Sequence, residues 1–190
     1  HITIEAKAGQ IGIENFDETI KGISSLSEIT HVAAIVEGQV LISGNDKARG
    51  ALVRGVRKLD FLSNDLILNG IVAGTLDQFE QDNGIIIGKR LAYALGVGVG
   101  DNVTLVSAKG RSTVMGEVPR SRSYNILALF DIGMYEYDIG IIYMPLAHSQ
   151  KFFLLGNHVN RIDVFLDNPA SAYGKRAAVR AVLNDDLRTH

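Results

Sequence analysis

The sequence contains no cysteine, which excludes disulfide bonds, thiolate metal sites and a cysteine nucleophile. It also lacks any run of about 18 uncharged apolar residues, so we expect no segment of it to span a bilayer. The formal net charge is only −2, and no global field points to nucleic acid. The length of 190 residues and the hydrophobic content of 46% suit one globular domain or two small ones. The chain starts at His1 without methionine or signal peptide, and we expect it to be a piece of a longer protein.

The common enzyme motifs are missing as well. The glycines of 96–100 follow a predicted helix, whereas a phosphate loop places its glycines before one. Segment 84–89 is one residue short of a P-loop, and Arg90 stands where a magnesium-binding Ser or Thr belongs. The five histidines share no metal-ligand spacing, and no G-x-S-x-G elbow occurs. These patterns indicate turns and surface positions rather than a nucleotide or metal site.

Three carboxylates that lie close in sequence are the remaining candidates for acid–base chemistry. Asp131, Glu136 and Asp138 surround an Ile-Gly-Met-Tyr segment, which we interpret as a solvated turn between strands. With no other catalytic constellation in the sequence, we predict no catalytic residue, no metal site and no cofactor. The chain is therefore predicted not to be an enzyme.

The two ends of the sequence carry the same pattern of strand, helix and strand. Alternating apolar residues predict strands at 2–6 and 161–167, and Asn15 with Glu18 forms a plausible capping pair for the first helix. The predicted order is strand 2–6, helix 15–26 and strand 31–37, and later strand 161–167, helix 170–184 and a strand starting at 188. Two β-α-β units at opposite ends, separated by about 120 residues, predict an α+β fold with an insert.

The middle of the chain is predicted to be mostly β. Residues 38–58 form a hairpin turned at 44–47, and residues 70–79 are expected to be a loop. Further expected elements are a strand at 85–87, a helix at 89–95 ended by Gly96, strands at 103–107, 124–130 and 139–144, and a helix opening at 145.

The segment between the strands at 103–107 and 124–130 is unusually long for a turn. It is expected to be a loop over 109–122, and ordinary hairpin loops have two to five residues. It carries cations near both ends and apolar residues between them: Lys109, Arg111, Val114, Met115, Val118, Pro119, Arg120 and Arg122. An exposed apolar tip on a basic stem suits docking on a partner, and a solvated surface loop is the alternative. The residues by themselves leave both interpretations open.

The chain resembles the periplasmic domain of the lipoprotein-releasing ABC transporter permeases, the LolC/LolE family. The resemblance covers nearly the whole chain and is carried by HVAAIVEGQVLISG, NGIIIGKRLAYALGVGVGDNVTLVS, VMGEVPRSRSYNILALFDIGMYEYD and GIIYMPLAHSQKFF. The second of these patterns is shared with efflux and cell-division permeases. The pattern Met115-Gly116, Pro119, Arg122 before the strand at 124–130 narrows the match to the LolC type.

This resemblance implies a periplasmic domain of an inner-membrane protein from Gram-negative bacteria, with a MacB-like periplasmic core. It would consist of a porter-like subdomain (1–38 and 158–190) and an inserted, mostly-β, sabre-like subdomain (39–157) with a protruding hook at about 108–121. The hook of the LolC type docks LolA, the soluble carrier of the lipoprotein substrate. By resemblance the contacts here would be Val114, Met115, Gly116, Glu117, Val118 and Pro119 on the hook, with Lys109, Arg111, Arg120 and Arg122 forming its basic stem and platform.

The resemblance also implies partners beyond the carrier. A separate cytoplasmic subunit would hydrolyse ATP, and a second permease subunit would complete the transporter; this subunit is either a relative or a second copy. Two positions depart from the LolC pattern, since Val114 replaces a proline of the hook and Thr104 replaces an arginine of the platform. The alternatives are the periplasmic domain of a MacB-like efflux permease that docks an adaptor protein, and a free-standing periplasmic domain.

Overall fold

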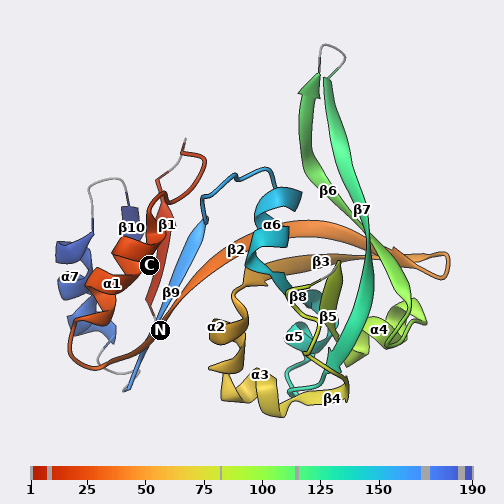
Figure 1. Ribbon diagram of the computed structural model, residues 1–190, viewed down its shortest axis with the longest axis horizontal. Helices are drawn as coiled ribbons and strands as arrows, with labels where there is room; N and C mark the ends of the chain where they lie inside the picture. The colour runs from red at the N-terminus through yellow and green to blue at the C-terminus, as the bar shows by residue number, and fades with distance from the viewer. Residues whose placement is uncertain are drawn as a thin grey trace. The chain divides into compact units, whose positions relative to one another are not determined.

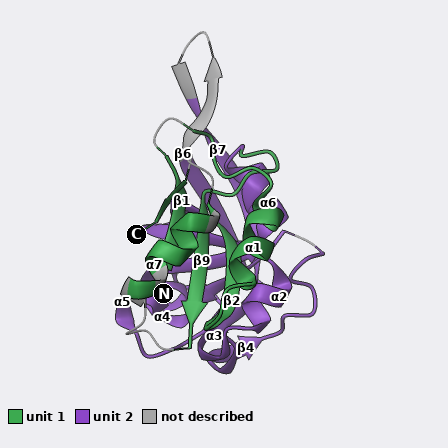
Figure 2. Ribbon diagram, turned by 90° about the vertical axis from the view of Figure 1, so that its left-hand side faces the viewer, with its two compact units in different colours: residues 1–36, 155–190 green, residues 37–154 purple. Residues whose placement is uncertain are grey.

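The computed structural model describes residues 2–7, 10–81, 83–113, 116–167, 172–183 and 187–189. The chain forms two compact units, which are coloured separately in Figure 2. Unit 1 combines the two ends of the chain, residues 1–36 and 155–190. Unit 2 is the continuous segment 37–154. Each unit has a sheet of its own, and the long strand β2 (Ile29–Gly44) contributes its first part to unit 1 and its second part to unit 2.

Unit 1 is a four-stranded antiparallel sheet with both helices on one face (Figures 1 and 2). The strand order is β10 (Leu187–Thr189), β1 (Ile2–Ala6), β9 (Arg161–Leu166) and β2. In chain order this is 4-1-3-2, the split β-α-β arrangement, with the helices α1 (Phe16–Ser24) and α7 (Ala172–Val182) as crossovers. The buried side chains of the unit include Ile2, Ile4, Ile23, Ile162, Val164 and Val179.

The predicted elements of unit 1 are confirmed in type and place, with one local exception. Asn15 was expected to cap α1 through its side chain, but it makes no side-chain cap bond. Its backbone is left-handed (φ 50°), and the helix begins with the Glu18 amide donating to the Asn15 carbonyl at 3.0 Å. The predicted capping pair is therefore wrong. The expected start of the second helix at 170 and its expected end at 184 lie outside the described residues.

Unit 2 is built on six strands whose pairings close into a ring. Going round, β2 is followed by β3 (Lys47–Val56), β8 (Ile141–Pro145), β5 (Gly84–Gly88), β7 (Gly116–Phe130) and β6 (Asn102–Thr113), which returns to β2. The β3–β8 and β5–β7 pairs are parallel. The short strand β4 (Ile71–Gly74) adds to β7 outside this ring. A closed ring leaves few unpaired strand edges.

Alternate residues of the ring strands form the main core of unit 2. Because side chains alternate along a strand, residues two apart point to the same side of the sheet. The helices α4 (Lys89–Leu95) and α6 (Leu146–Phe152) pack against this core. Its members include Val40, Ile42, Val53, Ile85, Ile87, Leu91, Leu95, Val103, Leu105, Tyr124, Ile126, Ile142, Met144 and Phe152.

Two predicted turns of unit 2 are confirmed. Asn45 and Asp46, between β2 and β3, have φ angles of 48° and 58°, as a two-residue hairpin turn of the primed type requires. Gly96 ends α4 with φ 72°, the left-handed conformation that glycine adopts without strain. Residues 31–37 and 38–44, both before the first turn, were predicted as separate strands, but they form the single strand β2.

Three expectations for unit 2 are wrong. Residues 70–79 contain strand β4, which pairs with the end of β7. The segment around Tyr135 is the helix α5 (Tyr135–Gly140) rather than a turn. The described residues of the loop expected at 109–122 form two paired strands. Two further short helices, α2 (Lys58–Leu62) and α3 (Asp65–Asn69), had no predicted counterpart.

Of the helices in the described part of the chain, none has both the length and the apolar character that crossing a bilayer takes.

Candidate docking hairpin

The long hairpin of β6 and β7 extends away from the strand ring of unit 2 (Figures 1 and 2). Its register runs from Asn102 opposite Asn125 to Thr113 opposite Gly116. The pairing of β6 with β2 ends at Val106, and β5 and β4 pair with β7 only from Asn125 onward. Between Ser107 and Arg120, therefore, each strand of the hairpin has only the other as partner among the described strands.

This free ribbon is long enough to reach a separate molecule. At about 3.4 Å per residue, the path from Ser107 to Thr113 spans about 20 Å. An isolated two-stranded ribbon has no buried face, which explains its polar and basic sequence. Without a buried face, the two strands have no alternation of apolar and polar residues. The sequence therefore predicted a loop at this place.

Pro119 marks an irregularity in this ribbon. The register passes from Ser107 opposite Arg120 to Arg111 opposite Val118. Between these two pairs β6 therefore contains more residues than β7. Proline has no backbone N–H to donate to a ladder and is found at strand edges and bulges. Both Pro119 and Val118 are exposed to solvent, and Val118 exposes 56% of its surface. The described part of the ribbon therefore presents two neighbouring apolar side chains.

The other predicted hook residues are placed less completely. Val114 and Met115 lie outside the described residues. Gly116 and Glu117 begin β7, and Lys109 and Arg111 belong to β6, but their side chains are outside the described part. The structure thus brings all of the described hook and stem positions onto one hairpin.

Two arginines at the base of the hairpin, Arg120 and Arg122, lie on the same face of β7 as the core residue Tyr124. Arg120, Arg122 and Tyr124 share one face of β7, because they are two residues apart. The Arg122 guanidinium donates to the Asn83 side-chain oxygen at 2.7 Å and lies 5.8 Å from the centroid of the Tyr124 ring. Both arginine side chains are half-buried. Arg122 therefore has contacts on two sides, with Asn83 and with Tyr124.

Tyr124 links this arginine pair to the core. Its side chain is buried, and its ring meets Phe152 edge-on with 6.0 Å between centroids. Burial raises the pKa of the Tyr124 hydroxyl, while the positive charges of Arg122 and Arg120 act in the opposite direction. The hydroxyl makes no hydrogen bond within the described structure. Tyr124 is therefore held in the core by an aromatic contact rather than by a hydrogen bond of its hydroxyl.

The carboxylates around α5 are arranged differently from the expected solvated turn. Asp138 is fully buried and accepts a hydrogen bond from the Ile132 amide at 2.9 Å. Asp131 pairs with the Lys89 ammonium at 3.4 Å. Desolvation raises the pKa of Asp131, but the Gly133 amide and the Lys89 ammonium outweigh it, so the pKa lies below its ordinary value. The expectation of a solvated turn is wrong for Asp138, whose carboxylate holds the segment before α5 in place.

Comparison with protein families gives a match over most of the chain. The model of the MacB-like periplasmic core domain matches residues 1–182. The chain belongs to this family. Two solved structures share the fold over the whole chain, each with a TM-score of 0.63: the periplasmic region of MacB from Actinobacillus actinomycetemcomitans (13% identity, 87% of that chain covered) and the extracellular domain of the transporter YknZ from Gram-positive bacteria (12% identity, 98% covered). The predicted fold class, α+β with a MacB-like periplasmic core, is confirmed.

Similar sequences carry names from the lipoprotein-releasing system. The transmembrane protein LolC of Neisseria meningitidis serogroup B is 27% identical over 173 residues, or 88% of this chain, and LolC of Xylella fastidiosa strain Temecula1 is 24% identical over 80% of it. LolE of Haemophilus influenzae is 23% identical over 91% of the chain. The matches span only 36% to 42% of these relatives. The predicted resemblance to the LolC and LolE permeases is confirmed by these matches, which cover most of this chain.

Proposed function

We propose that this MacB-like core is the periplasmic domain of a permease subunit in a lipoprotein-releasing ABC transporter of the LolC type. The names of the similar sequences support the transport system. We also propose that unit 2, the sabre-like part, recruits a soluble periplasmic lipoprotein carrier of the LolA kind. Unit 1 is then the porter-like part, continuous with an inner-membrane protein, and ATP is hydrolysed by a separate cytoplasmic subunit.

The observation that carries this proposal is the free ribbon between Ser107 and Arg120. A two-stranded ribbon that stands alone contributes little to a core, and its side chains are available to a partner. It offers an apolar pair, Val118 and Pro119, with the Arg122 cation at its base. These features match what a carrier with an apolar, acid-rimmed opening would recognise.

In the proposed handover, the tip and the base of the hairpin make different contacts with the carrier. The apolar tip enters the opening of the carrier, and Arg120 and Arg122 pair with acidic residues on its rim. Such charge pairs speed association and fix orientation more than they add affinity. A contact limited to one ribbon buries less than the roughly 800 Å² per partner of a standard interface, which suits a transient complex.

The experiment that tests the proposal measures binding of the carrier from the same organism to the domain with a shortened hairpin. Because Ser107 pairs with Arg120, replacing residues 108–119 by Asn-Gly closes the two strands in their existing register. This variant keeps both arginines and the whole ring. We expect it to fold normally and to lose carrier binding. Undiminished binding would overturn the assignment of the hairpin, and absent binding by the intact domain would favour the efflux-type alternative, in which an adaptor docks instead.

A point substitution tests the apolar residues of the ribbon separately. Val118→Ser is expected to weaken carrier binding about fivefold to tenfold, since it removes one exposed apolar contact of about 1 kcal/mol. Val99→Ser is a matched control, because Val99 exposes a similar 45% of its surface and lies in a turn of unit 2 outside the hairpin. Isothermal titration of the carrier into the two variants compares them. Equal affinities would contradict a contact at Val118.

A further inference from the structure

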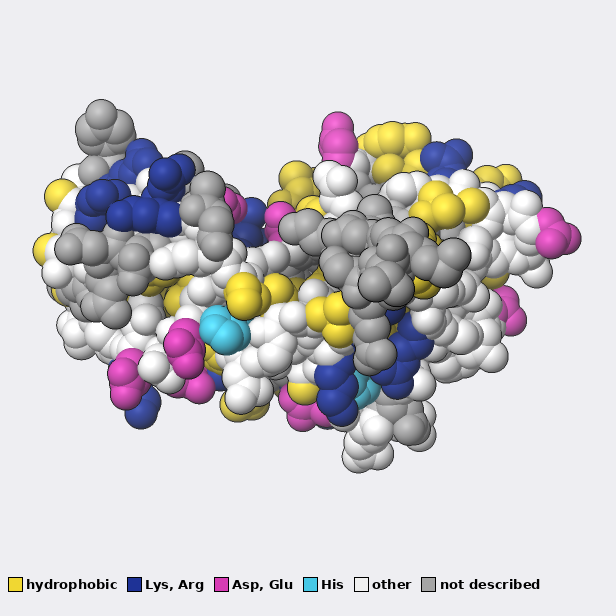
Figure 3. Space-filling model, turned by 90° about the horizontal axis from the view of Figure 1, so that it is seen from above, with side chains coloured by type: hydrophobic (Ala, Val, Ile, Leu, Met, Phe, Trp, Pro, Cys, Tyr) yellow, Lys and Arg dark blue, Asp and Glu magenta, His cyan; other side chains and the backbone are white. Residues whose placement is uncertain are grey.

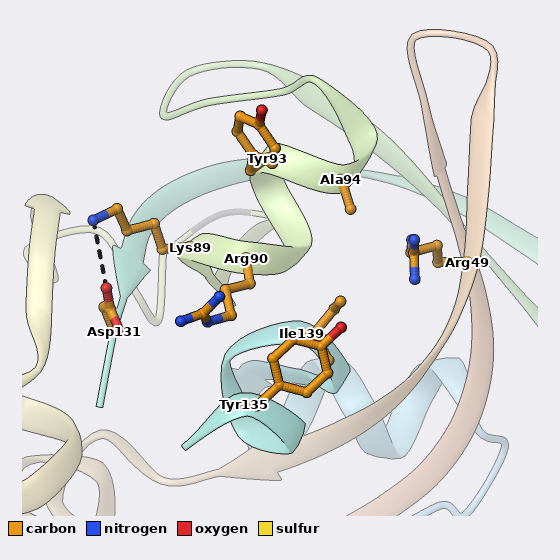
Figure 4. Close-up of a pocket in the computed structure, with 8 residues that line it drawn as sticks. All are labelled: Arg49, Lys89, Arg90, Tyr93, Ala94, Asp131, Tyr135 and Ile139. Atoms are coloured by element: carbon orange, nitrogen blue, oxygen red, sulfur yellow. Dashed lines mark hydrogen bonds and ion pairs between the residues drawn. The ribbon is translucent and has the colours of Figure 1, made fainter. Parts of the chain in front are cut away.

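A groove at the opposite end of unit 2 from the hairpin is not used by the proposed handover. It has a volume of about 540 Å³ and lies between α4, α5 and β3 (Figure 4). Its lining includes three cations, two tyrosines and one carboxylate: Arg49, Lys89, Arg90, Tyr93, Asp131 and Tyr135. Figures 1 and 2 both place α4 and α5 at the end of unit 2 that is remote from the hairpin.

The charges of the groove leave a positive surplus. Lys89 is paired with Asp131, the one carboxylate among the described residues of the lining. Arg49 and Arg90 are both exposed, and neither forms an ion pair with a carboxylate of the described residues. The side chains come from different elements, β3 and α4, and both line the groove in Figure 4. A ligand in this groove would therefore meet two unneutralised guanidinium groups.

The tyrosines give the groove an exposed aromatic rim. Tyr93 exposes 88% of its surface and Tyr135 exposes 58%. The Arg90 guanidinium lies 5.4 Å from the centroid of the Tyr135 ring, and such stacking holds its donors in a fixed orientation. Tyrosine and arginine are the residue types enriched in protein interfaces and in their energetically dominant positions. The residue types of the lining are thus typical of a docking surface rather than of an ordinary solvated surface.

We propose that this groove is a second docking site, for a protein segment that carries carboxylates beside apolar or aromatic side chains. The two guanidinium groups complement the carboxylates, each able to form paired hydrogen bonds with one. The tyrosine rings cover the apolar side chains. A concave groove of this volume fits one or two side chains of a peptide, whereas a membrane surface presents a plane of headgroups. The charge complementarity and the shape together favour the acidic peptide over an anionic lipid surface.

The test uses the domain and a short rhodamine-labelled peptide in which Glu alternates with Leu and Phe. Fluorescence anisotropy is expected to show binding to the wild-type domain. Arg90→Glu and Arg49→Glu, on separate elements, should each weaken it about tenfold or more. Lys151→Glu makes the same charge change on an exposed position outside the groove and should leave the affinity unchanged. The domain with the shortened hairpin should bind the peptide as wild type does, which separates this site from carrier recruitment.

Several outcomes would overturn the proposal. Equal affinity of the wild-type, Arg49→Glu and Arg90→Glu domains would show that the peptide binds elsewhere. Equal binding of a peptide with Gln in place of Glu would remove the role of charge. Binding to vesicles containing phosphatidylglycerol, with no binding of the peptide, would make the groove a lipid contact. Failure of the wild-type domain to bind the peptide would also reject it.

Discussion

At the scale of single residues, Gly88 holds β5 and α5 together by having no side chain. A Cβ atom at this position would lie 2.1 Å from the Asp138 carbonyl oxygen, and the atoms nearby are backbone that cannot rotate away. We expect Gly88→Ala to lower the free energy of unfolding by about 1–3 kcal/mol, the usual cost of overpacking.

Gly98→Ala is the matched control for this change, because a Cβ there would meet no described atom within 4 Å. Urea denaturation of the two variants measures the difference. If Gly88→Ala were as stable as Gly98→Ala, the close approach of α5 to β5 would not exist in solution.

Tyr124 gives the fold a pH dependence whose sign follows from its burial. The pKa of its hydroxyl is raised above the ordinary 10.0, so the unfolded chain loses this proton at a lower pH than the folded one. The stability that the neutral hydroxyl confers is therefore complete below pH 10 and is lost as the pH rises further. We expect the unfolding free energy of Tyr124→Phe to fall less steeply than that of wild type above pH 10. Parallel profiles from urea denaturation would contradict this.

At the scale of elements, the turn between β2 and β3 depends on residues that accept positive φ. Asp46 has φ 58°, a conformation that costs most residues about 1–2 kcal/mol and β-branched ones more. We expect Asp46→Val to destabilise the domain by about 1 kcal/mol or more. Lys47→Val, one residue later at the start of β3, should be nearly neutral because that position is extended. Thermal unfolding compares the two, and an equal melting temperature would argue against the turn.

The elements that could be predicted from sequence are those whose signal is local. Alternation of Ile2 and Ile4, the Asn45-Asp46 turn and the helix end at Gly96 depend on neighbouring residues only. Strand β4 and helix α5 are defined instead by distant partners, such as Phe130 opposite Ile71. Elements this short have too few residues for a periodic pattern to be recognised.

The candidate docking hairpin also could be predicted from the sequence only in part. Its location followed from a sequence pattern, but its conformation as paired strands did not, because a ribbon with two solvated faces carries no apolar alternation. The stacking of Arg122 over Tyr124 was also missed, although the i, i+2 spacing of cation and aromatic in a strand is a usable signal. The groove residues Arg90 and Tyr135 come together only through tertiary structure, and their sequence gives no such signal.

At the scale of the whole molecule, unit 2 is continuous in sequence and has its own closed ring and core. At nearly 120 residues it is long enough to bury a sufficient core. We expect the fragment 37–154 to fold alone, with one cooperative unfolding transition by circular dichroism and dispersed amide signals by NMR. A fragment that stays disordered would mean that the core of the ring depends on the rest of the chain.

The position of β1 imposes an order on how the chain can fold. Ile4 pairs on one side with Ile162 and on the other with Thr189, so β1 is enclosed by two strands that lie far from it in the sequence. Closing so long a loop is slow, because its entropy is lost before any contact compensates. Unit 2 can complete its ring while the chain is still emerging, and during that time residues 2–6 have neither neighbour. Strand β1 must therefore stay unpaired in solution until β9 and β10 have been synthesised.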